Sequence, residues 1–123
     1  MNQTSVVLVV DDSRVSRMMA RQFILSARPS WTVEEAATGE EAIDKVKTVS
    51  PALILIDVNM PGIGGMAAAE RLRALCPQAH ISLVTANVQN ATRNRAAELG
   101  IGFMEKPITE ERIHALVKAV ATD

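Results

Sequence analysis

The chain has 123 residues, of which 48% are hydrophobic and 22% are charged, so it can fold as one domain with a buried core and is not a disordered protein. Its formal net charge of −1 argues against nucleic acid or an anionic membrane surface as a partner, because both attract clustered basic residues. The single cysteine, Cys76, cannot form an internal disulfide, which fits a reducing compartment. No apolar run is long enough to span a membrane, and the N-terminus lacks the basic start and apolar core of a signal peptide. We therefore expect a cytoplasmic protein.

Strands and helices alternate along the chain. Three dense apolar runs rich in β-branched residues predict strands buried on both faces, at residues 6–10, 52–56 and 81–84. Weaker strands fit 32–36 and 102–105. Helical patterns follow these five strands, at residues 13–28, 38–49, 66–75, 89–99 and from 109 onward.

Capping residues mark where several of these helices begin and end. Ser13 and Thr109 are suited to N-cap positions, and Thr38 with Glu41 forms a capping box. Gly100 is suited to a C-terminal cap. The first helix is expected to bury an apolar face that contains Val15, Met18, Met19, Phe23 and Ile24. The last is expected to bury Ile113, Leu116, Val117 and Val120.

The five-fold alternation of strand and helix, with short loops, predicts right-handed βαβ units and therefore an α/β fold with a doubly wound five-stranded parallel sheet. The last predicted helix uses up the chain. We therefore expect a single domain over residues 1–123, with no second domain attached.

Polar side chains follow four of the predicted strands. Asp11 and Asp12 come after the first strand, Asp57 after the third, Thr85 after the fourth and Lys106 after the fifth. Ligands of open α/β sheets bind outside the carboxyl ends of the strands, so these groups are expected to converge. Singly, each has an ordinary structural role, such as an acid at a helix N-terminus. Together, crowded carboxylates repel one another unless a cation neutralises them, and hard oxygen ligands suit Mg²⁺.

These motifs resemble the receiver domain of bacterial two-component response regulators. The resemblance rests on the Asp11-Asp12 pair, the loop 57–62 (Asp-Val-Asn-Met-Pro-Gly), Thr85-Ala86 and Lys106-Pro107, in the family's order and spacing over the whole chain. It implies a flavodoxin- and CheY-like sheet with the strand order 2-1-3-4-5. It also implies a stand-alone receiver of the CheY type, without an output domain.

The resemblance implies a role for each acid. Asp57 would be the phosphoacceptor, which takes a phosphoryl group from a sensor histidine kinase or a phosphotransfer protein. Asp12 and Asp57 would bind Mg²⁺ directly, Asp11 mainly through water, and Asn59 through its backbone carbonyl. Asn59 and Asn87 flank the site and are expected to tune hydrolysis of the acyl phosphate. The protein would then be a switch that catalyses its own phosphorylation and dephosphorylation, rather than an enzyme with a separate substrate.

The resemblance also implies how the phosphoryl group is sensed. Lys106 and the metal would neutralise charge on the phosphoryl oxygens, and Thr85 would hydrogen-bond one of them. The peptide bond before Pro107 is often cis in such domains. Phe103 occupies an aromatic position that is often tyrosine in relatives. The Phe103 ring could still swing inward behind Thr85, but it has no hydroxyl group that could form a hydrogen bond there. A plain core role for Phe103 stays open as the alternative.

A downstream protein would bind the face formed by the fourth helix, the fifth strand and the fifth helix. Arg93 and Arg95 on the fourth helix either belong to that partner surface or form an ordinary solvated face. Gly62 and Gly65 are assigned to loop geometry and to no chemistry.

Three competing functions share features with this sequence. A haloacid-dehalogenase-type phosphohydrolase needs a second aspartate two positions after its nucleophile, where this chain has Ser13 after Asp11. A flavodoxin-like redox protein needs a hydroxyl-rich phosphate loop after the first strand, and aromatic residues are only 2% of the chain. A degenerate receiver used only for docking would not need all the active-site groups that are present here.

Overall fold

Five parallel strands form the central sheet of the computed structural model, which describes residues 5–86 and 89–121. The strands are β1 (Val6–Val10), β2 (Thr32–Ala36), β3 (Leu53–Asp57), β4 (His80–Thr85) and β5 (Gly102–Glu105). They lie in the order β2-β1-β3-β4-β5, and every neighbouring pair is parallel. The predicted α/β class and the predicted strand order are therefore confirmed.

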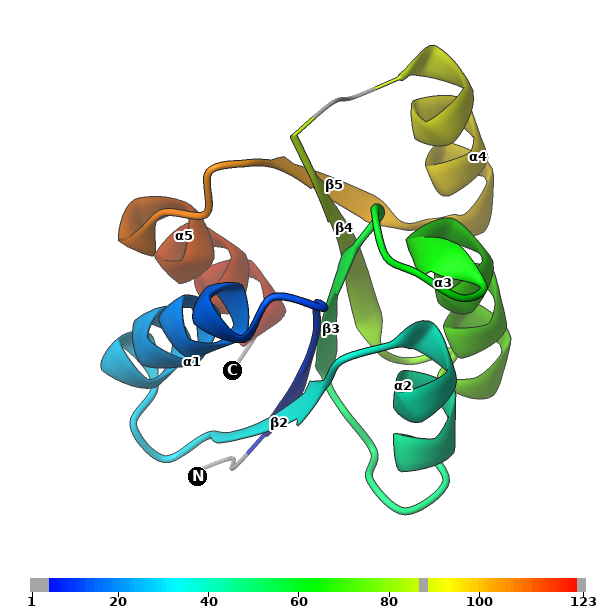
Figure 1. Cartoon of the computed structure of the whole chain (residues 1–123). Coiled ribbons are helices and arrows are strands. Elements are labelled where there is room, and N and C mark those ends of the chain that lie inside the picture. Colours follow the sequence, from blue (N-terminus) through cyan, green and yellow to red (C-terminus); the bar gives the residue numbers. More distant parts are fainter. Residues whose placement is uncertain (1–4, 87–88, 122–123) are drawn as a thin grey trace.

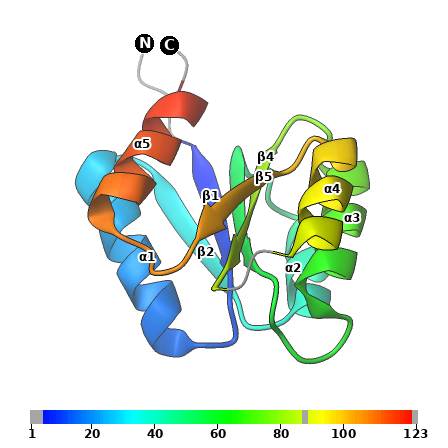
Figure 2. The ribbon, with the colours of Figure 1, turned by 90° about the horizontal axis from the view of Figure 1, so that it is seen from above.

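Helices cover both faces of this sheet. In chain order they are α1 (Arg14–Ala27), α2 (Gly39–Lys45), α3 (Gly64–Leu75), α4 (Asn90–Leu99) and α5 (Glu110–Val120). Figures 1 and 2 show α1 and α5 on one face and α2, α3 and α4 on the other. This arrangement places all the carboxyl ends of the strands at one edge of the sheet.

The continuous apolar runs of β1 and β3 supply side chains to both faces, because successive residues of a strand point in opposite directions. The core beneath α2, α3 and α4 contains Leu8, Val10, Ile54 and Ile56 from these two strands. The core beneath α1 and α5 contains Val7, Val9, Leu53 and Leu55 from the same strands. Burial on both faces is what the absence of polar alternation predicted.

The predicted strand boundaries match at 6–10, 32–36 and 102–105, and the other two strands differ by one residue at both ends. β3 begins at Leu53 and includes Asp57, so the candidate phosphoacceptor is the last residue of its strand. The second helix is shorter than predicted, because α2 ends at Lys45 and not near residue 49. The residues that follow include three β-branched side chains and then Pro51, which disfavour continuation of a helix.

The predicted N-cap residues and the C-terminal cap are confirmed, and the capping box forms in part, because Oε1 of Glu41 accepts from the backbone N–H of Ala37 rather than from that of Thr38. The hydroxyl groups of Ser13, Thr38 and Thr109 accept hydrogen bonds from backbone N–H groups three residues later, at distances of 3.0 to 3.2 Å. Gly100 has a φ of 68° at the end of α4, in the left-handed region that glycine adopts without strain.

The predicted apolar face of α1 is wrong in its first half. Val15, Met18 and Met19 are 65%, 56% and 43% exposed, whereas Ile24 is fully buried and Phe23 is half-buried. Met19 lines an open groove of about 430 Å³, whose other lining residues are Ser16, Ala86, Lys106, Pro107 and Ile108. The buried face of α1 is instead formed by Ala20 and Ile24.

Trp31 is buried and immediately precedes Thr32, which pairs with Val6 at the start of β1, so Trp31 lies at the amino end of the sheet. Over residues 5–86 and 89–121, no helix is both long enough and apolar enough to span a bilayer.

Candidate functional site

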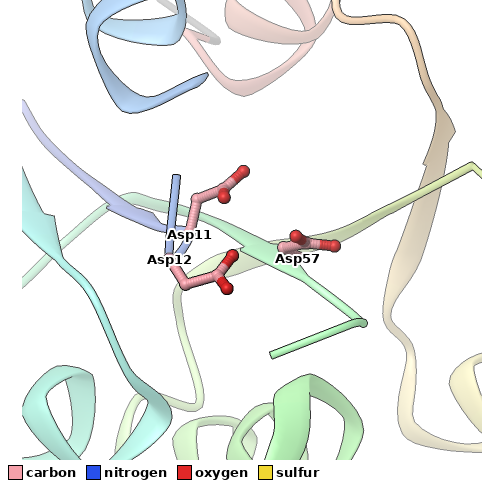
Figure 3. A group of neighbouring side chains, drawn as sticks. All are labelled: Asp11, Asp12 and Asp57. Atoms are coloured by element: carbon pink, nitrogen blue, oxygen red, sulfur yellow. The ribbon is translucent and has the colours of Figure 1, made fainter. Parts of the chain in front are cut away.

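Three carboxylates meet at the carboxyl edge of the sheet. Asp11 and Asp12 follow β1, and Asp57 ends β3, the neighbouring strand. Each contributes a carboxylate oxygen, and these oxygens lie within 4.8 Å of one another. Figure 3 shows the three side chains gathered around one space. The convergence predicted from the sequence is therefore present.

The backbone of the surrounding turns orients two of these carboxylates. Oδ1 of Asp11 accepts a hydrogen bond from the backbone N–H of Ser13 at 2.8 Å. Oδ1 of Asp57 accepts one from the backbone N–H of Asn59 at 3.1 Å. Asp11 and Asp57 are each only 4% exposed, whereas Asp12 is exposed. Two fixed, buried acids and one accessible acid therefore form the cluster.

The electrostatic environment of Asp11 reflects this crowding. Burial raises the pKa of the Asp11 carboxyl, because its charged form is poorly solvated. The hydrogen bond from the Ser13 N–H lowers this pKa, the charges of Asp57 and Asp12 raise it, and the charge of Lys106 lowers it. The site thus holds more negative charge than its own residues neutralise, which favours a bound cation.

Lys106 is the cation that this edge of the sheet supplies. Its Nζ atom lies 3.3 Å from Oδ2 of Asp57, and its side chain is 30% exposed. The backbone N–H of Lys106 donates to the carbonyl of Thr85 at 2.8 Å, which joins the ends of β5 and β4. The peptide bond between Lys106 and Pro107 is cis, as expected. Lys106 therefore faces the phosphoacceptor candidate from the opposite side to Asp11.

Thr85 and Phe103, the two predicted switch residues, lie on neighbouring strands. Thr85 is the last residue of β4 and is 1% exposed. Phe103 lies in β5, where it pairs with Leu83 of β4. Its side chain is half-buried and packs against the core beneath α2, α3 and α4. Asn59 is exposed, and Asn87 lies outside the described residues.

The donor set fits Mg²⁺. The three acids supply hard oxygen ligands only, from two turns that converge on one point. The exposure of Asp12 leaves room for the water molecules that Mg²⁺ usually retains. Of the two cationic side chains that contact these turns among the described residues, Lys106 contacts the carboxylate of Asp57, whereas Arg17 contacts the backbone carbonyl of Asp11 and none of the three acidic side chains of the cluster.

The sequence interpretation did not give the roles of two residues that shape the site. Gly65, which it assigned to loop geometry, lies in α3 and packs so closely on the end of β3 that a methyl group there would lie 2.0 Å from the carbonyl oxygen of Asp57. Arg17 on α1 donates to the carbonyl of Asp11 at 2.6 Å. Contacts of this kind have no short-range pattern in the sequence.

Comparisons with known proteins agree with this geometry. The sequence model of the family described as "Response regulator receiver domain" matches residues 7–118. The chemotaxis protein CheY of Thermotoga maritima is 32% identical over 108 residues, which cover 87% of this chain and 89% of that protein. The Vibrio cholerae chemotaxis protein CheY4 has a similar structure, with a TM-score of 0.86, 27% identity, and coverage of 96% of this chain and 99% of that one.

Some relatives are longer than this chain. The transcriptional activator protein ExaE of Pseudomonas putida is 31% identical over 101 residues, which cover 81% of this chain but 47% of that protein. The chain thus spans about half the length of this relative, and nearly all of CheY.

Proposed function

This chain belongs to the family of response regulator receiver domains, and on that basis we propose that it is a phosphoacceptor switch in which Asp57 receives a phosphoryl group from a histidine kinase or a phosphotransfer protein. The observation that carries the proposal is the position of Asp57, a buried carboxylate between two other acids and one lysine. Neither a degenerate receiver nor a flavin-binding protein needs that arrangement.

In the proposed reaction, a carboxylate oxygen of Asp57 attacks the phosphorus atom of a phosphohistidine. An O–P bond forms, the N–P bond of the donor breaks, and its electron pair returns to the imidazole nitrogen, which then takes up a proton. Attack of water on the phosphorus atom later returns the carboxylate and inorganic phosphate. The hydrogen bond from the backbone N–H of Asn59 to Oδ1 of Asp57 keeps the orientation of the Asp57 carboxylate group during both steps.

We expect Asp12 and Asp57 to hold Mg²⁺ directly and Asp11 to hold it mainly through water, with the backbone carbonyl of Asn59 as a further ligand. The metal, when bound, supplies positive charge that offsets the charge on the phosphoryl oxygens. The oxygen-only donor set and the excess of negative charge support this assignment.

Lys106 and Thr85 are proposed to bind the phosphoryl group itself. The ammonium group of Lys106 already contacts Oδ2 of Asp57, so it lies where charge develops during transfer. Thr85 ends the strand next to β3, and its hydroxyl can donate to a phosphoryl oxygen. The backbone N–H of Lys106, which follows β5, donates to the carbonyl of Thr85, the last residue of β4, so the two residues are held next to each other.

The signal is proposed to leave through α4, β5 and α5 to a downstream protein. Movement of Thr85 toward the phosphoryl group would make room for the Phe103 ring and would change the packing of α4. In the present structure Arg95 on α4 pairs with Glu70 on α3 at 2.8 Å and with Glu98 at 3.1 Å. A partner that binds Arg95 would therefore have to displace Glu70 and Glu98 from its guanidinium group. A partner that does not bind Arg95 would leave these ion pairs intact. The cytoplasmic location stays a prediction.

The central experiment measures phosphoryl uptake. The protein is incubated with acetyl phosphate and Mg²⁺, and its intact mass is recorded. We expect wild type to gain the mass of one phosphoryl group, and Asp57→Asn to gain none. Modification of the Asp57→Asn variant at a different aspartate would contradict the assignment.

A second experiment tests the metal. We expect Mg²⁺ to raise the melting temperature of wild type but not of Asp12→Ala, since a ligand that binds only the folded state stabilises it. In the absence of metal, Asp12→Ala is expected to be at least as stable as wild type, because it relieves repulsion among the acids. Equal stabilisation of both proteins by Mg²⁺ would remove Asp12 from the ligand set.

A further inference from the structure

Arg17 connects α1 to the turn that carries the two acids. Its Nη1 atom donates to the backbone carbonyl of Asp11 at 2.6 Å, and its Nε atom donates to Oε1 of Glu35 at 3.0 Å. The Arg17 side chain is 15% exposed and that of Glu35 on β2 is 30% exposed. The planar guanidinium group thus serves two acceptors from two elements at once, which is the geometry that distinguishes arginine from lysine.

The carbonyl that Arg17 holds belongs to the peptide group between Asp11 and Asp12. A peptide group is planar, so fixing its oxygen fixes the direction in which the chain enters Asp12. The peptide groups on either side are also held, because Asp11 N–H donates to Ala36 O at 3.1 Å and Ser13 N–H donates to Asp11 Oδ1 at 2.8 Å. Arg17 therefore completes a run of three fixed peptide groups through the acidic turn.

We propose that Arg17 is a positioning residue, which holds the Asp11–Asp12 peptide group so that Asp12 faces Asp57 and the proposed Mg²⁺ site. This inference rests on the proposed function, because it assigns a purpose to the orientation of a proposed metal ligand. Arg17 itself touches neither the metal nor the phosphoryl group in this assignment.

Glu35 holds the guanidinium group of Arg17 in place. Arg17 carries a positive charge against the turn that holds two of the three acids, and a free guanidinium could compete with the metal for them. The ion pair with Glu35 holds the group on the β2 side, where it contacts the carbonyl oxygen of Asp11 and not the Asp11 carboxylate. Arg21 shares Glu35 through Oε2 at 3.2 Å, but its other acceptor is Val33 O, away from the acidic turn.

The test compares Arg17→Met, Arg17→Lys and the matched control Arg21→Met. Mg²⁺ dissociation constants are measured by titration calorimetry, at a temperature where thermal melts show each protein to be folded. If Arg17 positions the turn, both Arg17 variants bind Mg²⁺ more weakly, by roughly 10- to 100-fold for Arg17→Met, as is typical for partners that orient a metal ligand. Arg21→Met, which removes the same charge from the same glutamate, is expected to bind as wild type does.

The sign of the change separates positioning from charge. If Arg17 acted only through its charge, Arg17→Met would bind Mg²⁺ more tightly than wild type and Arg17→Lys would match wild type. If Arg17 were merely structural, its variants would melt at lower temperature with an unchanged Mg²⁺ affinity. Either result would overturn the inference.

A metal-independent measurement separates this inference from the proposed function. Amide hydrogen exchange at Asp11 and Ser13 is followed by NMR in metal-free protein. Arg17→Met is expected to accelerate exchange at these two amides, and Arg21→Met is not. Wild type that binds no Mg²⁺ would overturn the proposed metal site, whereas unchanged exchange in Arg17→Met would overturn the positioning role by itself.

Discussion

Nζ of Lys106 lies 3.3 Å from Oδ2 of Asp57, a carboxylate 49 residues earlier in the chain. Asp57 ends β3 and Lys106 directly follows β5, and these two strands are separated in the sheet by β4. The Lys106 side chain therefore reaches across a strand to meet the acid. Asp57 is nearly buried, so this ammonium group partly offsets the cost of keeping a charge there.

The first prediction is that Lys106→Met separates phosphoryl transfer from metal binding. Removing the ammonium group removes a donor that faces the reacting oxygen, and losses of this kind slow a reaction by about 10²-fold or more. The affinity for Mg²⁺ is expected to stay or to rise, because a competing cation has left the site. Uptake from acetyl phosphate is followed by mass, and binding by calorimetry. Loss of Mg²⁺ binding in this variant would contradict the assigned roles.

The second prediction concerns Asp11 and pH. Burial raises the pKa of the Asp11 carboxyl above its unfolded value. The protonated form is therefore favoured by folding, and this contribution to stability is present below the unfolded pKa and is lost as pH rises through the folded pKa. In metal-free protein we expect Asp11→Asn to melt at a higher temperature than wild type near about pH 7, with a smaller difference near about pH 4.

Thermal melts with a chelator present check this prediction. The asparagine keeps an oxygen that can accept from the Ser13 N–H, so the variant changes charge and little else. A lower melting temperature for Asp11→Asn at neutral pH would mean that the carboxylate is a net stabilising group.

The third prediction concerns Gly65. A Cβ atom on Gly65 would lie 2.0 Å from Asp57 O and 2.7 Å from Val58 Cα, so either α3 or the end of β3 has to move. We expect Gly65→Ala to destabilise the fold by about 1–3 kcal/mol or more and to lower phosphoryl uptake by the folded protein. Gly64→Ala is the matched control, because Gly64 has a φ of 82° and no atom near its Cβ position.

The control variant tests backbone strain alone. Gly64→Ala is expected to cost about 1–3 kcal/mol of stability, with phosphoryl uptake unchanged once the protein is folded. If the two variants lower uptake equally, the close contact with Asp57 has no special effect on the site.

The topology and most of the site could be predicted because they depend on short-range patterns. The apolar runs at 6–10 and 52–56 mark strands buried on both faces, and parallel strands bring whatever follows them to one edge. That rule alone predicted that Asp11, Asp57 and Lys106 would meet. The predicted roles of these residues came from the resemblance to receiver domains, and they stay predictions.

The remainder depends on contacts between distant segments. Periodicity placed Met18 and Met19 on the buried face of α1, but both are exposed, and Met19 lines an open groove together with Lys106 and Pro107 from a distant segment. The contact of Gly65 with Asp57 and that of Arg17 with Asp11 likewise depend on how helices α3 and α1 sit on strand ends. Such distances follow from the packing of whole elements and have no signature in adjacent residues.

The last prediction concerns Phe103. Its ring packs on the α2–α4 side of β5, whereas the next residue, Met104, packs on the α1–α5 side. Thr85 ends the strand beside it, so an inward movement of Thr85 would open space on the side where the ring lies. Phe103 has no hydroxyl group to anchor it, so packing alone governs its position, and Phe103→Tyr is expected to be tolerated.

Phe103→Ala is expected to leave phosphoryl uptake at Asp57 intact while it abolishes the response of α4. The response is measured by NMR, as the change in amide shifts of α4 and of residues around Asp57 when beryllofluoride and Mg²⁺ are added as a phosphoryl mimic. Met104→Ala is the matched control, since it removes a side chain from the same strand but from the opposite core. It is expected to lower stability by about 2–5 kcal/mol and to keep the α4 response. If α4 responds in Phe103→Ala as it does in wild type, Phe103 is a core residue and the switch lies elsewhere.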